Sequence, residues 1–262
     1  MKHRHQSLEG DTFALERQQI PINHFHNRLT NMHPDLLALI VTLKLATSVT
    51  LVLALIGTPI AWWLSQSTSK ARVIVEPLIA LPIVLPPTVL GFYFLVAFAP
   101  DQIVGGIWLK LVGTPLAFTF SSLVIASCIY SLPFYIQPLQ LAFQSINRGF
   151  LEAASTLGAS PLKRFFYLIV PLSRRGFITA GSLAFAHTIG EFGIILMIGG
   201  SIPGETRVLS IALFDHVESL NYQNAHMLAL GLVIFSFLLL LAVYTLNRAP
   251  QEQNRGLRSH VS

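Results

Sequence analysis

Five apolar segments, each long enough to cross a lipid bilayer, restrict the fold of this chain more than any other feature. A helix needs about twenty apolar residues to span the hydrocarbon core of a membrane. The segments lie at about 36–64, 73–99, 116–136, 177–198 and 227–246. The sequence therefore predicts an all-α integral membrane protein with a five-helix transmembrane domain at 34–247, and it leaves a sixth helix open.

The composition agrees with a membrane protein. Charged residues make up 11% of the chain and hydrophobic residues 53%, whereas a soluble domain carries about 25% charged residues. The net charge of +5 does not indicate a nucleic-acid partner, because most cations flank the apolar segments and form no patch with interleaved aromatic residues. The single cysteine, Cys128, excludes an internal disulfide and a cysteine metal cluster, and we interpret it as a small core residue.

Polar tails flank the transmembrane domain on both sides. Residues 1–33 lack the apolar stretch of a secretory signal and contain five histidines. His24 and His26 form a weak metal-binding pattern without a third ligand, so we expect a flexible tail and no metal site. Residues 248–262 form a second, basic tail with three arginines.

Lysine and arginine residues in the short loops predict the orientation of the chain, because cytoplasmic loops are rich in these residues. Lys70 and Arg72 precede the second segment, and five cations lie in the central loop, residues 147–176. We therefore place both loops and the C-terminal tail in the cytoplasm. Five spans then place the N-terminus outside, which is unfavourable for the four cations of residues 1–33.

The central loop is predicted to form two short helices. Asn147 is a suitable N-cap for the first helix, and Gly158 can end it with a positive φ angle. Ser160 is a suitable N-cap for the second helix, with Pro161 at the first helical position. Pro171 is expected to end that helix.

The second helix of the central loop is amphipathic. Apolar side chains recur at three- and four-residue spacing beside the basic residues. They are Leu162, Phe165, Phe166 and Ile169. Such a face either lies on the inner leaflet of the membrane or docks to a cytosolic protein, and the spacing alone favours neither.

Within the second apolar segment, the stretch 81–88 contains three prolines, Pro82, Pro86 and Pro87. Each proline removes a donor from the helical hydrogen-bond ladder, and irregular backbone at membrane depth persists only beside protein or a water-filled path. A kinked helix next to a pore is one interpretation, and a bent helix with only a packing role is the other.

The fourth segment contains a carboxylate, Glu191, between Gly190 and Phe192-Gly193. An acidic residue in an apolar span is costly and is a candidate functional residue. His187 lies four residues earlier, on the same face of a continuous helix. The two side chains can form the proton relay of a secondary transporter, or a hydrogen-bonded structural pair that lines a gate at a helix interface.

The loop at 199–207, here named the outer loop, is rich in glycine and offers donors from Ser201, Thr206 and Arg207. These donors suit an anion or a docked protein, although a plain turn has the same residues. The chain has no G-x-x-x-x-G-K-[ST], H-E-x-x-H or G-x-S-x-G motif. It therefore contains no ATPase site of the P-loop type and no catalytic group of a hydrolase, and its energy must come from a partner.

Three motifs resemble one family of transporters. The run Glu152-Ala153-Ala154, followed by Gly158 and by Ile-Val-Pro-Leu at 169–172, is similar to the EAA loop of ABC importer permeases. The stretches LPIVLPPTVLGFYF and GEFG…IPGETR resemble molybdate-type permeases, and the resemblance covers about 36–215. His187 departs from it, since that family usually has arginine there, and 208–226 is only loosely similar. Sulfate permeases share the plan but match the outer loop less well.

The resemblance implies a type I ABC importer permease in the bacterial inner membrane, with the central loop as its cytoplasmic coupling helices. It implies that two ATPase subunits, which bind ATP and Mg²⁺, engage the central loop, so that this chain needs no cofactor. It also implies that an extracytoplasmic binding protein delivers molybdate or tungstate. Five spans are few for a complete pore, so we expect a two-fold homodimer. A sulfate or thiosulfate permease and a proton-coupled transporter using Glu191 and His187 are the alternatives.

Three groups of candidate site residues follow from these motifs. The ATPase-coupling group comprises Glu152, Ala153, Ala154, Gly158, Ser160, Pro161 and Pro171. The translocation path or gate comprises Pro82, Pro86, Pro87, Gly190, Glu191, Phe192 and Gly193. The outer-loop group, for docking of the binding protein or contact with the anion, comprises Ser201, Pro203, Gly204, Glu205, Thr206 and Arg207.

Overall fold

The computed structural model describes residues 34–247, and within this range every regular element is a helix. The predictions about the histidine-containing N-terminal tail, the side on which the N-terminus lies and the basic C-terminal tail concern residues outside this range. The fold class of an all-α membrane protein is confirmed, since several of the helices have the length and apolar composition of membrane spans.

Three helices are long and apolar enough to cross a membrane: α2 (Pro34–Gln66), α6 (Phe120–Gln144) and α13 (Tyr222–Asn247). Two further candidate spans are each divided into two helices. The helices α3 (Ala71–Val84) and α4 (Pro87–Ala97) meet at 109°, and α10 (Arg174–Gly190) and α11 (Gly193–Gly199) meet at 61°. The described residues therefore contain up to five spans, two of which are broken.

Two of the expected segments differ from the helices in detail. The prediction of a single kinked helix over 73–99 is wrong, because the chain turns by 109° at Leu85 and Pro86. The third segment was placed at 116–136, but α6 begins after Thr119 and continues to Gln144. Thr119 sets this start, since its hydroxyl accepts a hydrogen bond from the amide of Ser122 at 3.3 Å.

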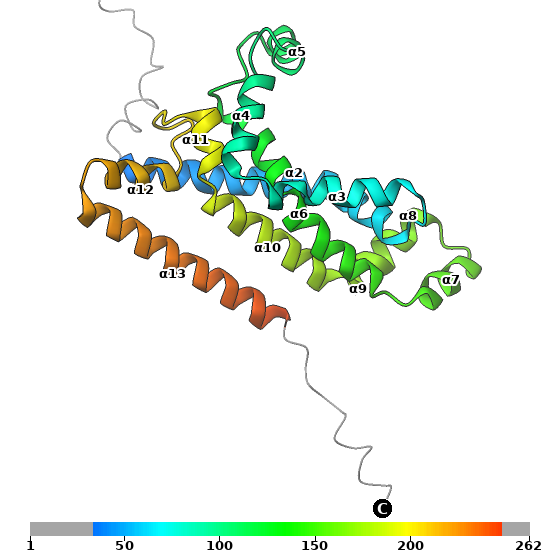
Figure 1. The fold of residues 1–262 in the computed structure, drawn as a ribbon. Coiled ribbons are helices and arrows are strands. Elements are labelled where there is room, and N and C mark those ends of the chain that lie inside the picture. Colours follow the sequence, from blue (N-terminus) through cyan, green and yellow to red (C-terminus); the bar gives the residue numbers. More distant parts are fainter. Residues whose placement is uncertain (1–33, 248–262) are drawn as a thin grey trace, which may run out of the picture.

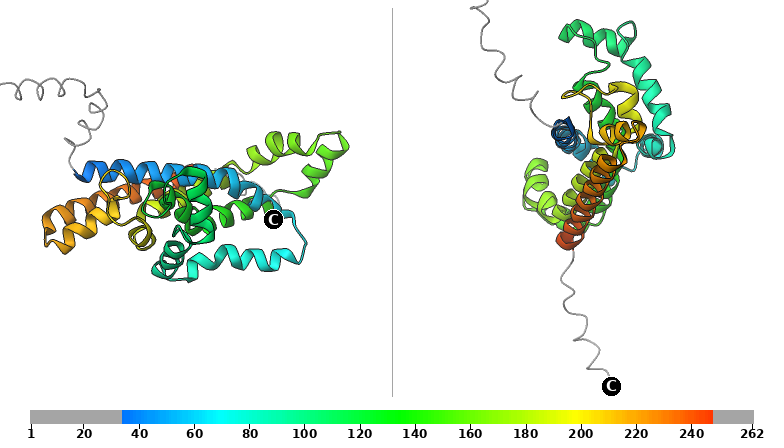
Figure 2. Two further views of the ribbon diagram at one scale, coloured as in Figure 1. Left: turned by 90° about the horizontal axis from the view of Figure 1, so that it is seen from above. Right: turned by 90° about the vertical axis from the view of Figure 1, so that its left-hand side faces the viewer.

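The long helices lie lengthwise beside one another (Figure 1). The short helix α12 (Leu209–Glu218) lies at one end, and α7 (Arg148–Thr156) and α8 (Pro161–Arg164) of the central loop lie at the opposite end. The helices α4 and α5 (Ile103–Val112) project away from the bundle, as Figure 1 and the right-hand view of Figure 2 show. The two loops that the sequence placed on opposite sides of the membrane are thus at opposite ends of the bundle.

The core lies where α2, α6 and α10 cross. Leucine and valine side chains of α2, such as Leu45 and Leu53, are buried against Leu139 of α6 and Ala184 of α10. Small residues on α10 allow the helix backbones to approach closely, as is common in membrane bundles. By contrast, most side chains of α13 are apolar and exposed, which suits a helix surrounded by lipid or by a partner.

Gly57 of α2 and Tyr135 of α6 form a close contact within this core. A Cβ atom at Gly57 would lie 2.8 Å from the Cδ1 atom of Tyr135. The ring of Tyr135 is buried, and its hydroxyl is hydrogen-bonded to the hydroxyl of Thr58 at 3.1 Å. The ring therefore has little freedom to move away.

We predict that Gly57→Val destabilises the protein by about 1–3 kcal/mol through overpacking against Tyr135. Gly231→Val is the matched control, because a Cβ atom at Gly231 meets no atom within 4 Å. The melting temperature of each purified variant in detergent gives the comparison. Equal melting temperatures for the two variants would show that the α2–α6 crossing is looser than described.

Candidate functional site

The two helix breaks pack against each other. A Cβ atom at Gly193, the first residue of α11, would lie 2.9 Å from the Cβ atom of Pro87, the first residue of α4. One turn further along α4, a Cβ atom at Gly91 would lie 2.8 Å from the Cβ atom of Met197. The sequence assigned both breaks to the translocation path, and the structure brings them together. We refer to Leu85–Pro87 and Glu191–Gly193 as the paired breaks.

Proline chemistry accounts for the first break. Leu85 and Pro86 each precede a proline, and both have an extended backbone with ψ angles of 137° and 136°. Pro87 then occupies the first position of α4, where its missing N–H leaves no hydrogen bond unmade. Pro82 lies within α3 and is buried. The chain therefore has to leave the helical path at this point.

Glu191 accounts for the geometry of the second break. The residue is 6% exposed and has an extended backbone, so α10 ends at Gly190. Its carboxylate accepts a hydrogen bond from the amide of Ile194 at 3.1 Å, and its carbonyl accepts one from the hydroxyl of Ser210 at 2.6 Å. An acceptor at the start of a helix satisfies a free amide and is favoured by the helix dipole. Glu191 thus fixes the start of α11.

His187 is not hydrogen-bonded to Glu191, so the predicted pair is wrong. The pair assumed a continuous helix, but α10 ends before Glu191. The Nδ1 atom of His187 is instead hydrogen-bonded to the hydroxyl of Ser131 at 3.0 Å. The imidazole ring stacks on Phe134 at 3.9 Å between ring centroids. These contacts join α10 to α6. They do not link His187 to Glu191, as a proton relay between the two side chains would require.

Phe192 and Gly190 complete the second break. The ring of Phe192 lies 5.0 Å from the ring of Phe214 on α12. Gly190 is exposed, and a Cβ atom there would meet no atom within 4 Å. The four path residues predicted in the fourth segment therefore have four different environments: an open face, a buried cap, an aromatic contact and the close packing of Gly193 against Pro87.

The central loop forms its two helices with the predicted caps. The side-chain oxygen of Asn147 accepts a hydrogen bond from the amide of Gly149 at 2.8 Å, and the hydroxyl of Ser160 accepts one from Lys163 at 3.4 Å. Gly158 has a φ angle of +80°, which a side chain rarely adopts. Pro161 occupies the first position of α8.

The end of the second helix differs from the prediction. Pro171 does not end it, because the helix continues through a π-helix, η2 (Phe165–Ile169), into α9 (Val170–Leu172). In η2 the amide of Val170 bonds to the carbonyl of Phe165, five residues back. Pro171 offers no N–H and its ring would clash with the carbonyl four residues back, so a wider turn relieves the conflict.

The apolar face of the central loop is divided between the bundle and solvent. Phe165 packs edge-on against Trp62 of α2, with 6.1 Å between ring centroids, and Ile169 is 2% exposed. By contrast, Leu162 and Phe166 are exposed, as is Glu152. A cavity of about 380 Å³ separates the end of α2 from the central loop. The loop is thus anchored on one side and offers apolar side chains on the other.

The donors of the outer loop are bonded within the chain. Thr206 is buried, and its hydroxyl donates to the carbonyl of Gly199 at 2.7 Å. Arg207 and Ser201 both bond to a carboxylate oxygen of Asp215, at 2.9 and 3.2 Å. The exposed rim of this loop consists of residues 201–205, that is Ser201, Ile202, Pro203, Gly204 and Glu205. Its shape is therefore fixed, and Thr206 and Arg207 serve to fix it.

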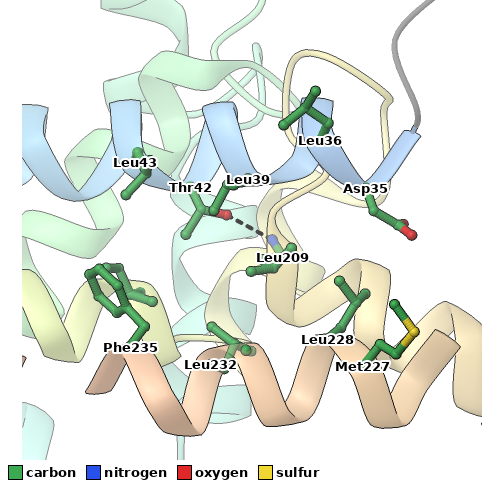
Figure 3. A pocket seen from close by; sticks show the side chains of 12 residues that line it. Asp35, Leu36, Leu39, Thr42, Leu43, Leu209, Met227, Leu228, Leu232 and Phe235 are labelled. Carbon is green, nitrogen blue, oxygen red and sulfur yellow. Dashed lines mark hydrogen bonds between the residues drawn. The ribbon is translucent and has the colours of Figure 1, made fainter. Parts of the chain in front are cut away.

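The outer loop is fastened to α2 through α12. The amide of Leu209 donates to the hydroxyl of Thr42 at 2.7 Å (Figure 3), and His216 bonds to Asp35 at 3.1 Å. An apolar cavity of about 570 Å³ lies between α2, α12 and α13. Sequence reasoning missed these contacts, since they join residues more than 160 positions apart and carry no local signal.

A model of the family "Binding-protein-dependent transport system inner membrane component" matches residues 37–251. The chain belongs to this family, and it is a multi-pass inner membrane protein of the transport component type.

Several curated relatives are permeases. A molybdenum transport system permease from Azotobacter vinelandii is 53% identical over 214 residues, which cover 82% of this chain and 95% of the relative. The corresponding protein of Escherichia coli K12 is 31% identical, with coverage of 71% and 81%. A probable sulfate transport system permease from Nephroselmis olivacea is also 31% identical, with coverage of 78% and 71%.

Solved structures of ABC importers share the fold. A bacterial alginate ABC transporter aligns with a TM-score of 0.66 at 16% identity, covering 93% of this chain and 89% of the other. The MetNI methionine transporter, in an inward-facing conformation, aligns with a TM-score of 0.61 at 16% identity, with coverage of 80% and 92%. The fold is therefore that of a type I ABC importer permease.

We predict that Gly193→Val abolishes transport by forcing Pro87 away from α11, because the added Cβ atom has no room. Gly231→Val is the control, since Gly231 lies outside both breaks and a Cβ atom there would meet no atom within 4 Å. The measurement is uptake of the transported substrate by cells that hold equal amounts of each variant in the membrane. Full uptake by the Gly193 variant would contradict a functional role for the close packing of the breaks.

Proposed function

We propose that this chain is the transmembrane permease subunit of an ATP-driven importer for molybdate or for the similar tetrahedral oxyanion tungstate. The observation that carries the proposal is the 53% identity to a molybdenum transport permease over 82% of the chain. A sulfate permease is the second candidate, supported by a relative of that description at 31% identity. The lower identity makes sulfate the weaker choice.

The proposed assembly contains two copies of this chain around a shared path, two ATPase subunits and an extracytoplasmic binding protein. The central loop suits the ATPase, because it has exposed apolar side chains at Leu162 and Phe166 beside basic residues. The exposed rim of the outer loop, at the opposite end of the bundle, suits the binding protein (Figure 1). ATP and Mg²⁺ bind to the partner ATPase, so the permease carries no cofactor.

The central loop is connected to the paired breaks through α10, and backbone hydrogen bonds join the start of α10 to η2. The amide of Ser173 bonds to Ile169 of η2, and the amide of Phe177 bonds to Ser173. Helix α10 then runs for 17 residues to the second break, a length of about 25 Å at 1.5 Å per residue. A movement of the central loop is therefore carried along α10 to the contact between Gly193 and Pro87.

In this mechanism the ATPase pair closes on ATP and moves the two central loops. The movement switches the paired breaks between a state open to the cytoplasm and a state open to the binding protein, which releases its anion into the path. ATP hydrolysis then returns the paired breaks to the state open to the cytoplasm. This is a two-state gate whose equilibrium is biased at a distant site.

The substrate is tested by reconstituting the permease with its ATPase and binding protein in proteoliposomes. We expect molybdate and tungstate, loaded on the binding protein, to stimulate ATP hydrolysis and sulfate to stimulate it little. Stimulation by sulfate alone would replace the proposal with the sulfate permease. Gradient-driven uptake without ATP would instead support a secondary transporter.

The coupling role of the central loop is tested by Gly158→Val, which strains a residue with a φ angle of +80°. We expect the variant to lose most of its stimulated ATPase activity because the loop no longer fits its partner. Gly113→Val is a matched control, since Gly113 has a φ angle of +83° and lies outside the central loop. If both variants retain the same coupling, the loop is not the coupling element.

A further inference from the structure

Three glutamines line one face of α6 near its cytoplasmic end. Gln137, Gln140 and Gln144 are three and four residues apart, which places them on the same side of the helix. Arg72 and Glu76 of α3 lie opposite to them. Together these residues line a cavity of about 650 Å³ between α3 and α6, which we name the glutamine cavity. No motif noted in the sequence includes it.

Glu76 organises the polar groups of the glutamine cavity. One of its carboxylate oxygens accepts hydrogen bonds from the Nε atom of Arg72 at 2.8 Å and from the side-chain nitrogen, Nε2, of Gln140 at 2.6 Å. These bonds fix the Arg72 guanidinium and leave its two terminal nitrogens outside the ion pair. Gln137 and Gln144 are exposed, and neither side chain has a hydrogen bond within residues 34–247. The cavity therefore presents unused N–H donors.

The glutamine cavity opens toward the end of the bundle that carries the central loop. Gln144 is the last residue of α6 and Arg72 the second residue of α3. Gln137 lies seven residues before the end of α6, about 10 Å deeper at 1.5 Å per residue. Polar side chains at this depth face protein or water, because contact with lipid is costly. Beyond the cavity, α3 leads to the first of the paired breaks.

We propose that Arg72, Gln137 and Gln144 bind the tetrahedral oxyanion on the cytoplasmic side of the paired breaks, before its release. The inference rests on the proposed function. A doubly charged tetrahedral oxyanion only accepts hydrogen bonds, and these residues supply a guanidinium and two amides as donors. Glu76 offsets the charge of Arg72, which keeps binding weak. Weak binding suits a path, since an anion has to leave as easily as it enters.

The test is equilibrium binding of radioactive molybdate or tungstate to the nucleotide-free complex of permease and ATPase in detergent. Binding to the ATPase alone is subtracted. We expect one weak binding site per permease chain. The affinity for the oxyanion should fall about tenfold in Arg72→Gln and in Gln144→Leu, because each variant loses one donor group. Lys70→Gln is the control, because it removes a cation two residues from Arg72 without lining the cavity. Gln144 has no side-chain hydrogen bond to lose, so its variant keeps the fold.

Wild-type affinity in both cavity variants would overturn the inference, as would the absence of binding to the wild-type complex at millimolar oxyanion. Equal weakening in the Lys70 variant would do the same, since it would indicate a general effect of charge. Oxyanion-stimulated ATPase activity is measured on the same preparations. If stimulation persists while the cavity variants bind normally, this inference alone fails. If no oxyanion stimulates the wild-type complex, the proposed function fails.

Discussion

The contact between Pro87 and Gly193 is the point on which the arrangement of this permease depends. Two spans are broken, and each break leaves helix ends whose backbone groups need partners at membrane depth. The breaks satisfy this need jointly. Pro87 has no N–H to leave unpaired, Glu191 caps α11 with its carboxylate, and the missing side chain of Gly193 lets the two helix starts touch. A longer side chain at that position would separate them.

In the proposed mechanism, the rest of the chain holds and moves this contact. On one side, α10 joins it to the π-helix and the central loop, and backbone bonds of Ser173 with Ile169 and of Phe177 with Ser173 span the junction. On the other side, the hydroxyl of Ser210 bonds to the carbonyl of Glu191, and α12 is fastened to α2 by hydrogen bonds of Leu209 with Thr42 and of His216 with Asp35. The paired breaks are therefore linked to both ends of the bundle, as a gate between an ATPase and a binding protein requires.

Local chemistry made much of this predictable. The caps at Asn147 and Ser160, the positive φ of Gly158 and a distortion of the helix at its prolines follow from residues within a few positions of each other. The full break, a turn of 109° between α3 and α4, was not predicted. The π-helix was not predicted, because it depends on how Pro171 fits a helix that Phe165 and Ile169 anchor to the bundle. The predicted pair of His187 and Glu191 does not form. Helix α10 ends at Gly190, and Glu191 caps α11 instead, so the two side chains do not lie on one helix face. Contacts such as Asp35 with His216 depend on the tertiary fold alone.

The central claim is that ATP moves the paired breaks through the central loop. It is tested most directly by pulsed electron paramagnetic resonance, which measures the distance between two spin labels. Spin labels at Thr88, an exposed residue next to Pro87, report the separation of the breaks in the two copies of the proposed homodimer, with Cys128 replaced by alanine. The account predicts that this distance differs between the nucleotide-free and the ATP-bound complex. It also predicts that the distance between labels at Leu157 in the two central loops differs between the same two states. A change at Leu157 without any change at Thr88 would contradict it.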